Sequence, residues 1–121
     1  MYEIIFYKDK KGEEPVLKYI QELVSRTNKD SRIKANKILA YIDYLRSMGK
    51  QAREPYVKHL GCEIWELRPI RDRILFAAWD EQSFILLHHF MKQTQKTPQR
   101  EIDQAKRNLA DMRERGIDNE Q

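Results

Sequence analysis

Four runs rich in β-branched and aromatic residues predict strands, and they occupy residues 2–7, 63–68, 73–79 and 84–90. The run at 73–79 is almost wholly apolar, which is typical of a strand that is covered on both faces. Polar turns separate the last three runs, so we expect these to form an antiparallel meander.

Three stretches with apolar residues at helical spacing predict helices. The first opens at Glu14-Pro15, because proline suits a first turn. The second ends at Gly49, and the third is expected to begin at Thr97-Pro98, with the threonine hydroxyl as its cap. The stripes that we expect to face the core contain Val16, Ile20, Leu23 and Val24 in the first helix, Ile33, Ile38, Tyr41, Ile42, Leu45 and Met48 in the second, and Ile102, Ala105, Leu109 and Met112 in the third.

The order β-α-α-β-β-β-α predicts an α+β fold, in which helices pack on a small, twisted antiparallel sheet. The first two helices are joined by a few residues, so we expect a helical hairpin on one face of the sheet. A length of 121 residues suits a single domain, residues 1–121. Trp65 and Trp79 stand in apolar surroundings and are expected in the core.

Charge and composition narrow the functional classes. Lys and Arg number 23 against 19 Asp and Glu, a net +4, and the segment from Lys29 to Lys58 holds eight basic residues and three acidic ones. Such a segment is either a solvated helical face or a surface for RNA or a protein partner. The single cysteine, Cys62, excludes an internal disulfide and suits a reducing compartment. The chain has no apolar run of the roughly 20 residues that a membrane span needs, and its start does not resemble a signal peptide, so we expect a cytoplasmic protein with no membrane partner.

Common cofactor and metal motifs are absent from the chain. There is no phosphate-binding loop, no dinucleotide fingerprint, no nucleophile elbow and no zinc-ligand spacing. His88 and His89 are neighbours on a predicted strand, so they point to opposite faces and cannot share one metal ion. We therefore expect no metal and no cofactor. One of the two histidines is expected against the core and the other within reach of solvent, where it could transfer protons.

A group of basic residues remains as candidate chemistry, with titratable residues near it in the predicted meander. Strand alternation places Glu66 and Arg68 on the face opposite Trp65, and Arg73 opens the next strand across a short hairpin. Two arginines brought together need an anion between them. That anion is either a substrate phosphate, held by fixed guanidinium groups, or Glu66 itself. The full set is Arg68, Arg73, Lys92 and Lys96, with Glu66, His89 and His59 as titratable neighbours.

Several motifs between Leu60 and Arg107 occur in a characteristic order. They are Leu60-Gly61, Ile64-Trp65-Glu66-Leu67-Arg68, Arg73-Ile74-Leu75-Phe76, the run from Leu86 to Pro98, and Glu101-Ile102 before Ala105. In this order and spacing the chain resembles the RelE/ParE superfamily of bacterial toxins, in its HigB-like, phage-derived branch. That branch carries Phe-x-Lys-Lys-Thr after its last strand, and Gln93 replaces the second lysine here, so no catalytic role carries over to that position.

The resemblance implies a toxin of a type II toxin–antitoxin system that cleaves mRNA on the ribosome. A ribose 2′-hydroxyl would attack the adjacent phosphorus without a metal. A cognate helix-turn-helix antitoxin, HigA-like, would neutralise the toxin in a heterotetramer or larger complex. The family pattern marks Arg73 as a functional position, Lys92 and Lys96 as a functional basic cluster, and Arg68 as a basic strand position. The candidates for general base and acid are Glu66, His89 and Tyr56.

Two other functions stay open at this stage. Relatives in the same superfamily inhibit DNA gyrase by binding, as ParE does, and such an inhibitor needs no phosphate-facing cluster on its sheet. A non-enzymatic basic module that binds RNA or a protein is the third possibility, because aromatic side chains on a sheet can stack bases. A neighbouring gene with a helix-turn-helix pattern would favour a toxin over this module.

Overall fold

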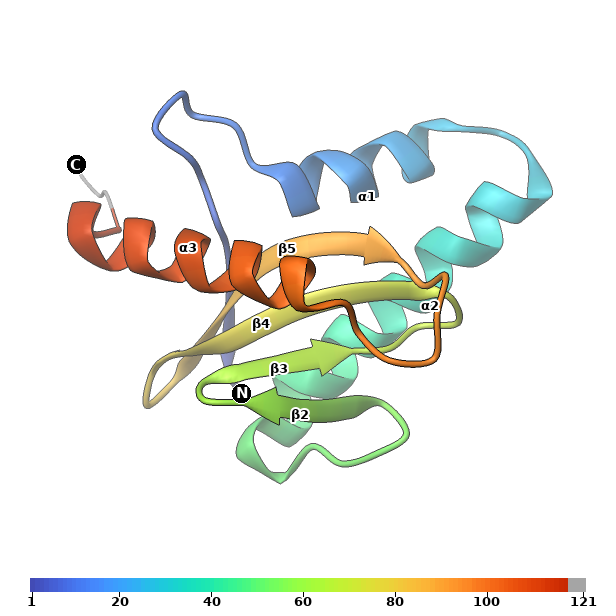
Figure 1. Ribbon diagram of the computed structural model, residues 1–121. Helices are drawn as coiled ribbons and strands as arrows, with labels where there is room; N and C mark the ends of the chain where they lie inside the picture. The colour runs from blue at the N-terminus through green and yellow to red at the C-terminus, as the bar shows by residue number, and fades with distance from the viewer. Residues whose placement is uncertain (118–121) are drawn as a thin grey trace.

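One strand and two helices precede four consecutive strands, and a last helix closes the chain. The structure, a computed structural model, describes residues 1–117 (Figure 1). None of the helices in these residues is both long and apolar enough to cross a membrane. The elements are β1 (Glu3–Phe6), α1 (Pro15–Ser25), α2 (Lys29–Met48), a short 3-10 helix (Gly49–Gln51), β2 (Val57–Gly61), β3 (Ile64–Leu67), β4 (Asp72–Asp80), β5 (Ser83–Met91) and α3 (Gln99–Arg115).

The five strands form one mixed sheet in the order β1-β5-β4-β3-β2. Strands β3, β4 and β5 pair antiparallel, as the predicted meander requires, and β2 adds a further antiparallel strand. The prediction of a wholly antiparallel sheet is wrong at one edge, where β1 pairs parallel with β5, with Ile4 opposite Phe84. The α+β class is confirmed, with a parallel pair at one edge. Strand β2 was not predicted, because it is an edge strand in which only Val57 is buried and no apolar alternation results.

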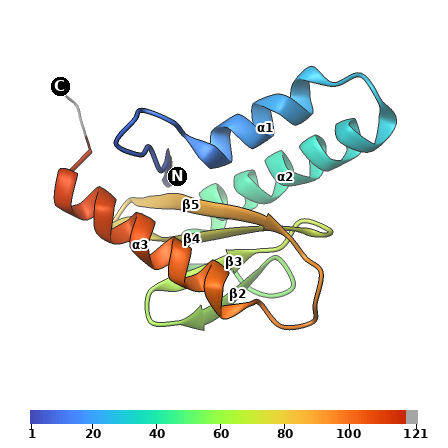
Figure 2. The same cartoon turned by 45° about the horizontal axis from the view of Figure 1, so that its top comes forward.

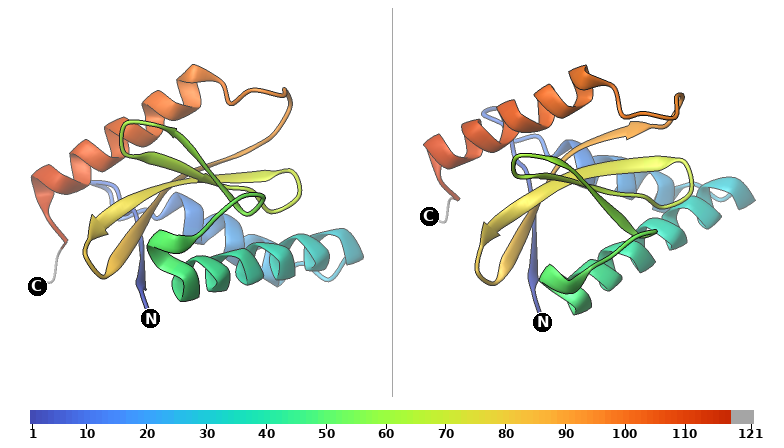
Figure 3. Two further views of the ribbon diagram at one scale, coloured as in Figure 1. Left: turned by 90° about the horizontal axis from the view of Figure 1, so that it is seen from below. Right: turned by 60° about the horizontal axis from the view of Figure 1, so that its bottom comes forward.

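Helices cover both faces of the sheet, and each face has its own core. In β4, Ile74 and Phe76 pack with α1 and α2, while Leu75 and Ala77 pack with α3 on the other side. Figure 2 shows α3 crossing the sheet away from the α1–α2 hairpin, and Figure 3 shows α2 and α3 on opposite sides of it. The predicted hairpin on one face is therefore confirmed.

Some residues of the predicted apolar stripes lie outside the core. Val24, Ile33 and Met48 belong to the predicted stripes, yet all three are exposed. The prediction that Trp65 is a core residue is wrong, because the residue is 36% exposed on a strand next to the sheet edge, where α2 covers Leu67 instead. Trp79 is half-buried against the α3 core.

The helix ends show one confirmed and one wrong expectation. Gly49 ends α2 with φ 57°, and the ring of Tyr2 lies where a Cβ would stand, so only glycine fits there. Helix α3 begins one residue later than predicted, and no side chain caps it. The hydroxyl of Thr97 instead donates a hydrogen bond of 2.5 Å to Oε2 of Glu66 on β3.

Candidate functional site

The candidate residues gather where three neighbouring strands meet. Because β3, β4 and β5 run antiparallel, the end of β3, the start of β4 and the end of β5 lie at the same end of the sheet (Figure 1). This end carries Glu66, Arg68 and Arg73, and the chain from Lys92 to Thr97 passes beside it. We call Glu66, Arg68 and Arg73 the arginine cluster.

Glu66 lies at the centre of the arginine cluster, with its side chain only 2% exposed. Its Oε1 is 3.5 Å from Nε of Arg68 and 3.9 Å from Nε of Arg73, and its Oε2 accepts the bond from Thr97. Of the two anions considered from the sequence, Glu66 is thus the counter-ion that holds the arginines together. A carboxylate with both oxygens engaged is a positioning group, and it leaves the outward side of Arg68 available to a ligand.

From its place at the start of a predicted strand, Arg73 is expected to face solvent and to be replaceable by alanine without harm to the fold. The structure contradicts this expectation, because Arg73 is buried. It is 6% exposed, and its Nη1 donates 2.9 Å hydrogen bonds to the carbonyl oxygens of Ile70 and Asp72. Burial lowers the pKa of Arg73, while the charge of Glu66 opposes that change. Ile70 has φ 59°, a conformation that costs a β-branched residue about 1–3 kcal/mol. Arg73 therefore holds a strained turn beside the cluster.

Arg68 differs from Arg73 in exposure and in contacts. Its side chain is 24% exposed, and within residues 1–117 its guanidinium has one ion-pair partner, Glu66, and no hydrogen bond. The guanidinium is held at one edge by a fixed carboxylate and is open at the other. This is the geometry that suits a bidentate contact to a phosphate.

The two predicted lysines lie on the segment that follows β5. Lys92 is half-buried and Lys96 is exposed, and neither ammonium has a partner in the described part of the chain. Two hydrogen bonds to Arg71 fix the backbone of Lys92. The N–H of Lys92 donates a 2.7 Å bond to the carbonyl oxygen of Arg71, and Nη2 of Arg71 donates a 2.8 Å bond to the carbonyl oxygen of Lys92. Arg71 and the exposed Arg100 add to this basic end and were missed, although Arg71 stands in the same turn as Arg73.

His89 lies on the opposite face of the sheet from the arginine cluster. Its Nε2 donates a 2.9 Å bond to Oδ1 of Asp72, and its ring stacks on Tyr19 at 3.7 Å. Tyr19 donates to the same oxygen at 2.7 Å, and Lys34 lies 3.9 Å from it. Burial raises the pKa of Asp72, but the bonds from His89 and Tyr19 and the charge of Lys34 outweigh it, so the net pKa is lowered. We call these four residues the Asp72 network.

The other titratable candidates also have partners. His88 faces α3, as strand alternation predicts, and its Nε2 lies 2.7 Å from Oε1 of Glu101. His59 bonds the carbonyl oxygen of Cys62 at 2.9 Å. Tyr56 stacks on Tyr44. Within residues 1–117, no three His, Cys, Asp or Glu side chains are grouped so that they could hold a metal ion.

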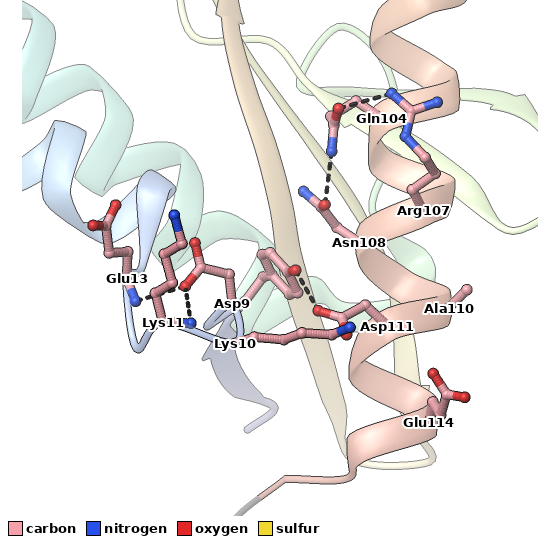
Figure 4. Close-up of a pocket in the computed structure, with 11 residues that line it drawn as sticks. Asp9, Lys10, Lys11, Glu13, Gln104, Arg107, Asn108, Ala110, Asp111 and Glu114 are labelled. Atoms are coloured by element: carbon pink, nitrogen blue, oxygen red, sulfur yellow. Dashed lines mark hydrogen bonds between the residues drawn. The ribbon is translucent and has the colours of Figure 1, made fainter.

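A large open cleft lies apart from the candidate residues. It has a volume of about 850 Å³ and lies between the turn after β1 and helix α3. Figure 4 shows Asp9, Lys10 and Lys11 on one side and Gln104 and Arg107 on the other. Beside it, Tyr7 donates a 2.5 Å bond to Asp111. Burial and this acceptor raise the pKa of Tyr7 to about 12.

The contact between Tyr7 and Asp111 ties the first strand segment to the last helix. Tyr7→Phe keeps the ring and removes the hydroxyl, so the free energy of unfolding is expected to fall by about 1–2 kcal/mol. Tyr2→Phe is the matched control, since the Tyr2 hydroxyl makes no hydrogen bond within residues 1–117. Urea denaturation of both variants measures the difference, and equal stabilities would contradict the prediction.

Comparison with known proteins identifies the family of the chain. No curated protein matches the chain. The family model described as "Phage derived protein Gp49-like" matches residues 25–110, well over half of the chain, from the end of α1 to late in α3. All residues of the arginine cluster, together with Lys92 and Lys96, lie inside this match. The chain therefore belongs to the Gp49-like family of phage-derived proteins, which is part of the RelE/HigB-like group of toxins.

Proposed function

We propose that this protein is a HigB-like toxin of a type II toxin–antitoxin system and that it cleaves mRNA on the ribosome. The observation that carries the proposal is the open guanidinium of Arg68, fixed by buried Glu66 beside the unpartnered Lys92 and Lys96. Family membership supports the same conclusion, because the group consists of toxins. A gyrase inhibitor would not need such a cluster.

The proposed chemistry is attack by a ribose 2′-hydroxyl on the adjacent phosphorus, which breaks the bond to the leaving 5′-oxygen. The negative charge of the pentavalent phosphate grows in the transition state and is stabilised by donors that are already in place. Arg68 contacts that phosphate, and Lys92 and Lys96 bind neighbouring phosphates. Glu66 and Arg73 act through Arg68, so they are positioning residues.

Expression of the protein tests this function. We expect growth arrest, and primer extension should find cuts in mRNA in a translating extract but not in buffer. Co-expression of a neighbouring helix-turn-helix antitoxin, HigA-like, should restore growth by covering the basic end of the sheet. Arrest without mRNA cuts, together with loss of gyrase supercoiling, would favour a ParE-like inhibitor instead.

RNA binding is expected to weaken steeply as salt is raised. Each phosphate contact of Arg68, Lys92 or Lys96 adds about 0.7 to the slope of log affinity against log salt for a single strand, so three contacts give about 2. Lys96→Ala should lower this slope by about 0.7, whereas Lys18→Ala on α1 should not change it. Binding that disappears with a chelator and returns with manganese or zinc would contradict this account.

A further inference from the structure

Ile70 lies in the turn between β3 and β4, in a backbone conformation that isoleucine rarely takes. The N–H of Asp72 donates a 3.0 Å hydrogen bond to the carbonyl oxygen of Pro69, which closes a four-residue β-turn with Ile70 as its second residue. Ile70 has φ 59°, whereas Arg71, the third residue, has no positive φ. A positive φ at the second residue alone is typical of a type II′ turn, in which that position is normally glycine.

The side chain of Ile70 contributes little to the fold. The residue is 50% exposed and belongs to neither of the two apolar cores. Its conformation strains a β-branched residue and leaves glycine unstrained. Strained residues persist where their surroundings fix them, and they occur often at functional sites. An exposed, strained side chain that the fold does not need is a candidate for contact with a ligand.

The backbone of this turn is fixed to the arginine cluster. Nη1 of Arg73 donates its 2.9 Å bond to the carbonyl oxygen of Ile70, and Pro69 is buried. Oε1 of Glu66 lies 3.9 Å from Nε of Arg73 and 3.5 Å from Nε of Arg68. Arg68 precedes Ile70 by two residues, so their Cα atoms are at most about 7 Å apart. The turn therefore presents Ile70 from a rigid backbone at the border of the cluster.

The exposed charges next to Ile70 are positive. Arg71 is exposed and has no carboxylate partner in the described residues, and its two hydrogen bonds to the backbone of Lys92 join the turn to the segment after β5 (Figure 1). The acidic residues between positions 66 and 73 are Glu66 and Asp72, and both side chains are only 2% exposed. The cations are thus free to bind phosphates, while the acids are engaged inside the protein.

An exposed aliphatic side chain among cations suits a nucleic acid. Several classes of nucleic-acid-binding protein insert isoleucine, leucine or methionine against bases and between them. The bases of single-stranded RNA are available for such a contact, because they are not fixed in a duplex. The cations then hold the phosphates, and the apolar group covers the face of a base.

We propose that Ile70 packs against the face of a nucleobase of single-stranded RNA whose phosphates are bound by Arg68, Arg71 and Lys92. This inference rests on the proposed function, because it names how the same end of the sheet holds its substrate. Ile70 takes no part in proton transfer. Its contribution is to affinity for the base, and it does not depend on which phosphate is cleaved.

Ile70→Gly tests the inference, with affinity measured for two short RNA strands of equal length, one normal and one with abasic positions. The affinity for the normal strand should fall about three- to tenfold, as loss of the apolar contact made by the exposed half of the side chain predicts. The affinity for the abasic strand should stay unchanged. The melting temperature should not fall, because glycine relieves the strain of the positive φ.

Two further variants complete the experiment. Cys62→Gly is the matched control, because Cys62 is an exposed residue with φ 51° in the turn at the opposite end of β3. It should leave both affinities as they are in the original protein. Arg71→Ala should lower both affinities, since both strands carry phosphates.

Several outcomes would overturn the inference. Equal losses on the normal and abasic strands in Ile70→Gly would show that the turn acts on the phosphate contacts alone, and a lower melting temperature would show that the side chain supports the fold. Unchanged affinity for the normal strand, failure of the original protein to bind it at low salt, or an effect of Ile70→Gly on binding of the antitoxin alone would also refute it. Failure of the proposed function appears separately, as absence of mRNA cuts by the original protein in the translating extract.

Discussion

Replacing Arg68 with alanine is expected to abolish growth arrest and to slow mRNA cleavage by about a hundredfold or more, while the domain stays folded. In the proposed mechanism, the donor lost in this variant is the one that contacts the transition-state phosphate. The cost to stability is about 1 kcal/mol or less, because the side chain is partly exposed and Glu66 is its only partner in the described chain. Glu66 keeps its contacts to Arg73 and Thr97 in this variant.

Arg113→Ala is the matched control for this experiment. Arg113 is also a partly exposed arginine with one carboxylate partner, Glu63, and it lies near the far end of α3. Growth arrest by Arg113→Ala should equal that of the original protein at the same soluble level. If Arg68→Ala kept full toxicity at that level, the phosphate contact would be refuted.

Arg73→Ala is a less specific test of catalysis than Arg68→Ala, although the sequence favoured Arg73 for this purpose. A strand-end arginine was expected to be removable without harm to the fold. Its burial and its bonds to Ile70 and Asp72 mean that Arg73→Ala leaves two carbonyl oxygens and part of Glu66 unsatisfied. Breaking a buried pair costs about 3–5 kcal/mol, so any loss of toxicity would come with loss of folded protein.

Local patterns predicted the strands and helices well, because each buries an apolar face that repeats with its own period. The alternation in β3 placed Glu66 opposite Trp65 and Leu67 correctly. The alternation could not show that Glu66 is buried, because the group that packs over its carboxylate is Thr97, which lies 31 positions further along the chain. Trp65 was misplaced for the related reason that the helices of residues 1–117 cover its side of the sheet only in part, which leaves it 36% exposed.

The partners of the histidines show the same limit of local patterns. Strand alternation separated His88 and His89, and the structure agrees. The carboxylates that bind them come from α3 and from β4, and Tyr19 reaches Asp72 from α1 across 53 positions. Contacts of this kind depend on how the helices pack on the sheet, which no spacing within one element encodes.

Asp72→Asn is expected to lower the free energy of unfolding by about 2–3 kcal/mol at neutral pH. Asp72 is almost fully buried, and the Asp72 network joins α1, α2, β4 and β5 through one carboxylate oxygen. Asparagine has nearly the same shape but no charge, so the bonds from Tyr19 and His89 lose their charged acceptor and Lys34 loses its ion pair. Urea denaturation at pH 7 measures the change, and Asp43→Asn on the exposed side of α2 is the matched control.

The same variant should reveal the pH dependence of this contribution. The pKa of Asp72 in the folded protein lies below its ordinary value of 3.8. The carboxylate therefore binds protons more readily in the unfolded chain, so its stabilising effect is complete above the unfolded pKa and is lost as the pH falls through the folded pKa. Asparagine does not titrate in this range. The stability difference between the two proteins should be largest at neutral pH and should shrink below about pH 4, and a difference that stays constant from pH 7 to pH 3 would show that Asp72 stabilises the fold by shape alone.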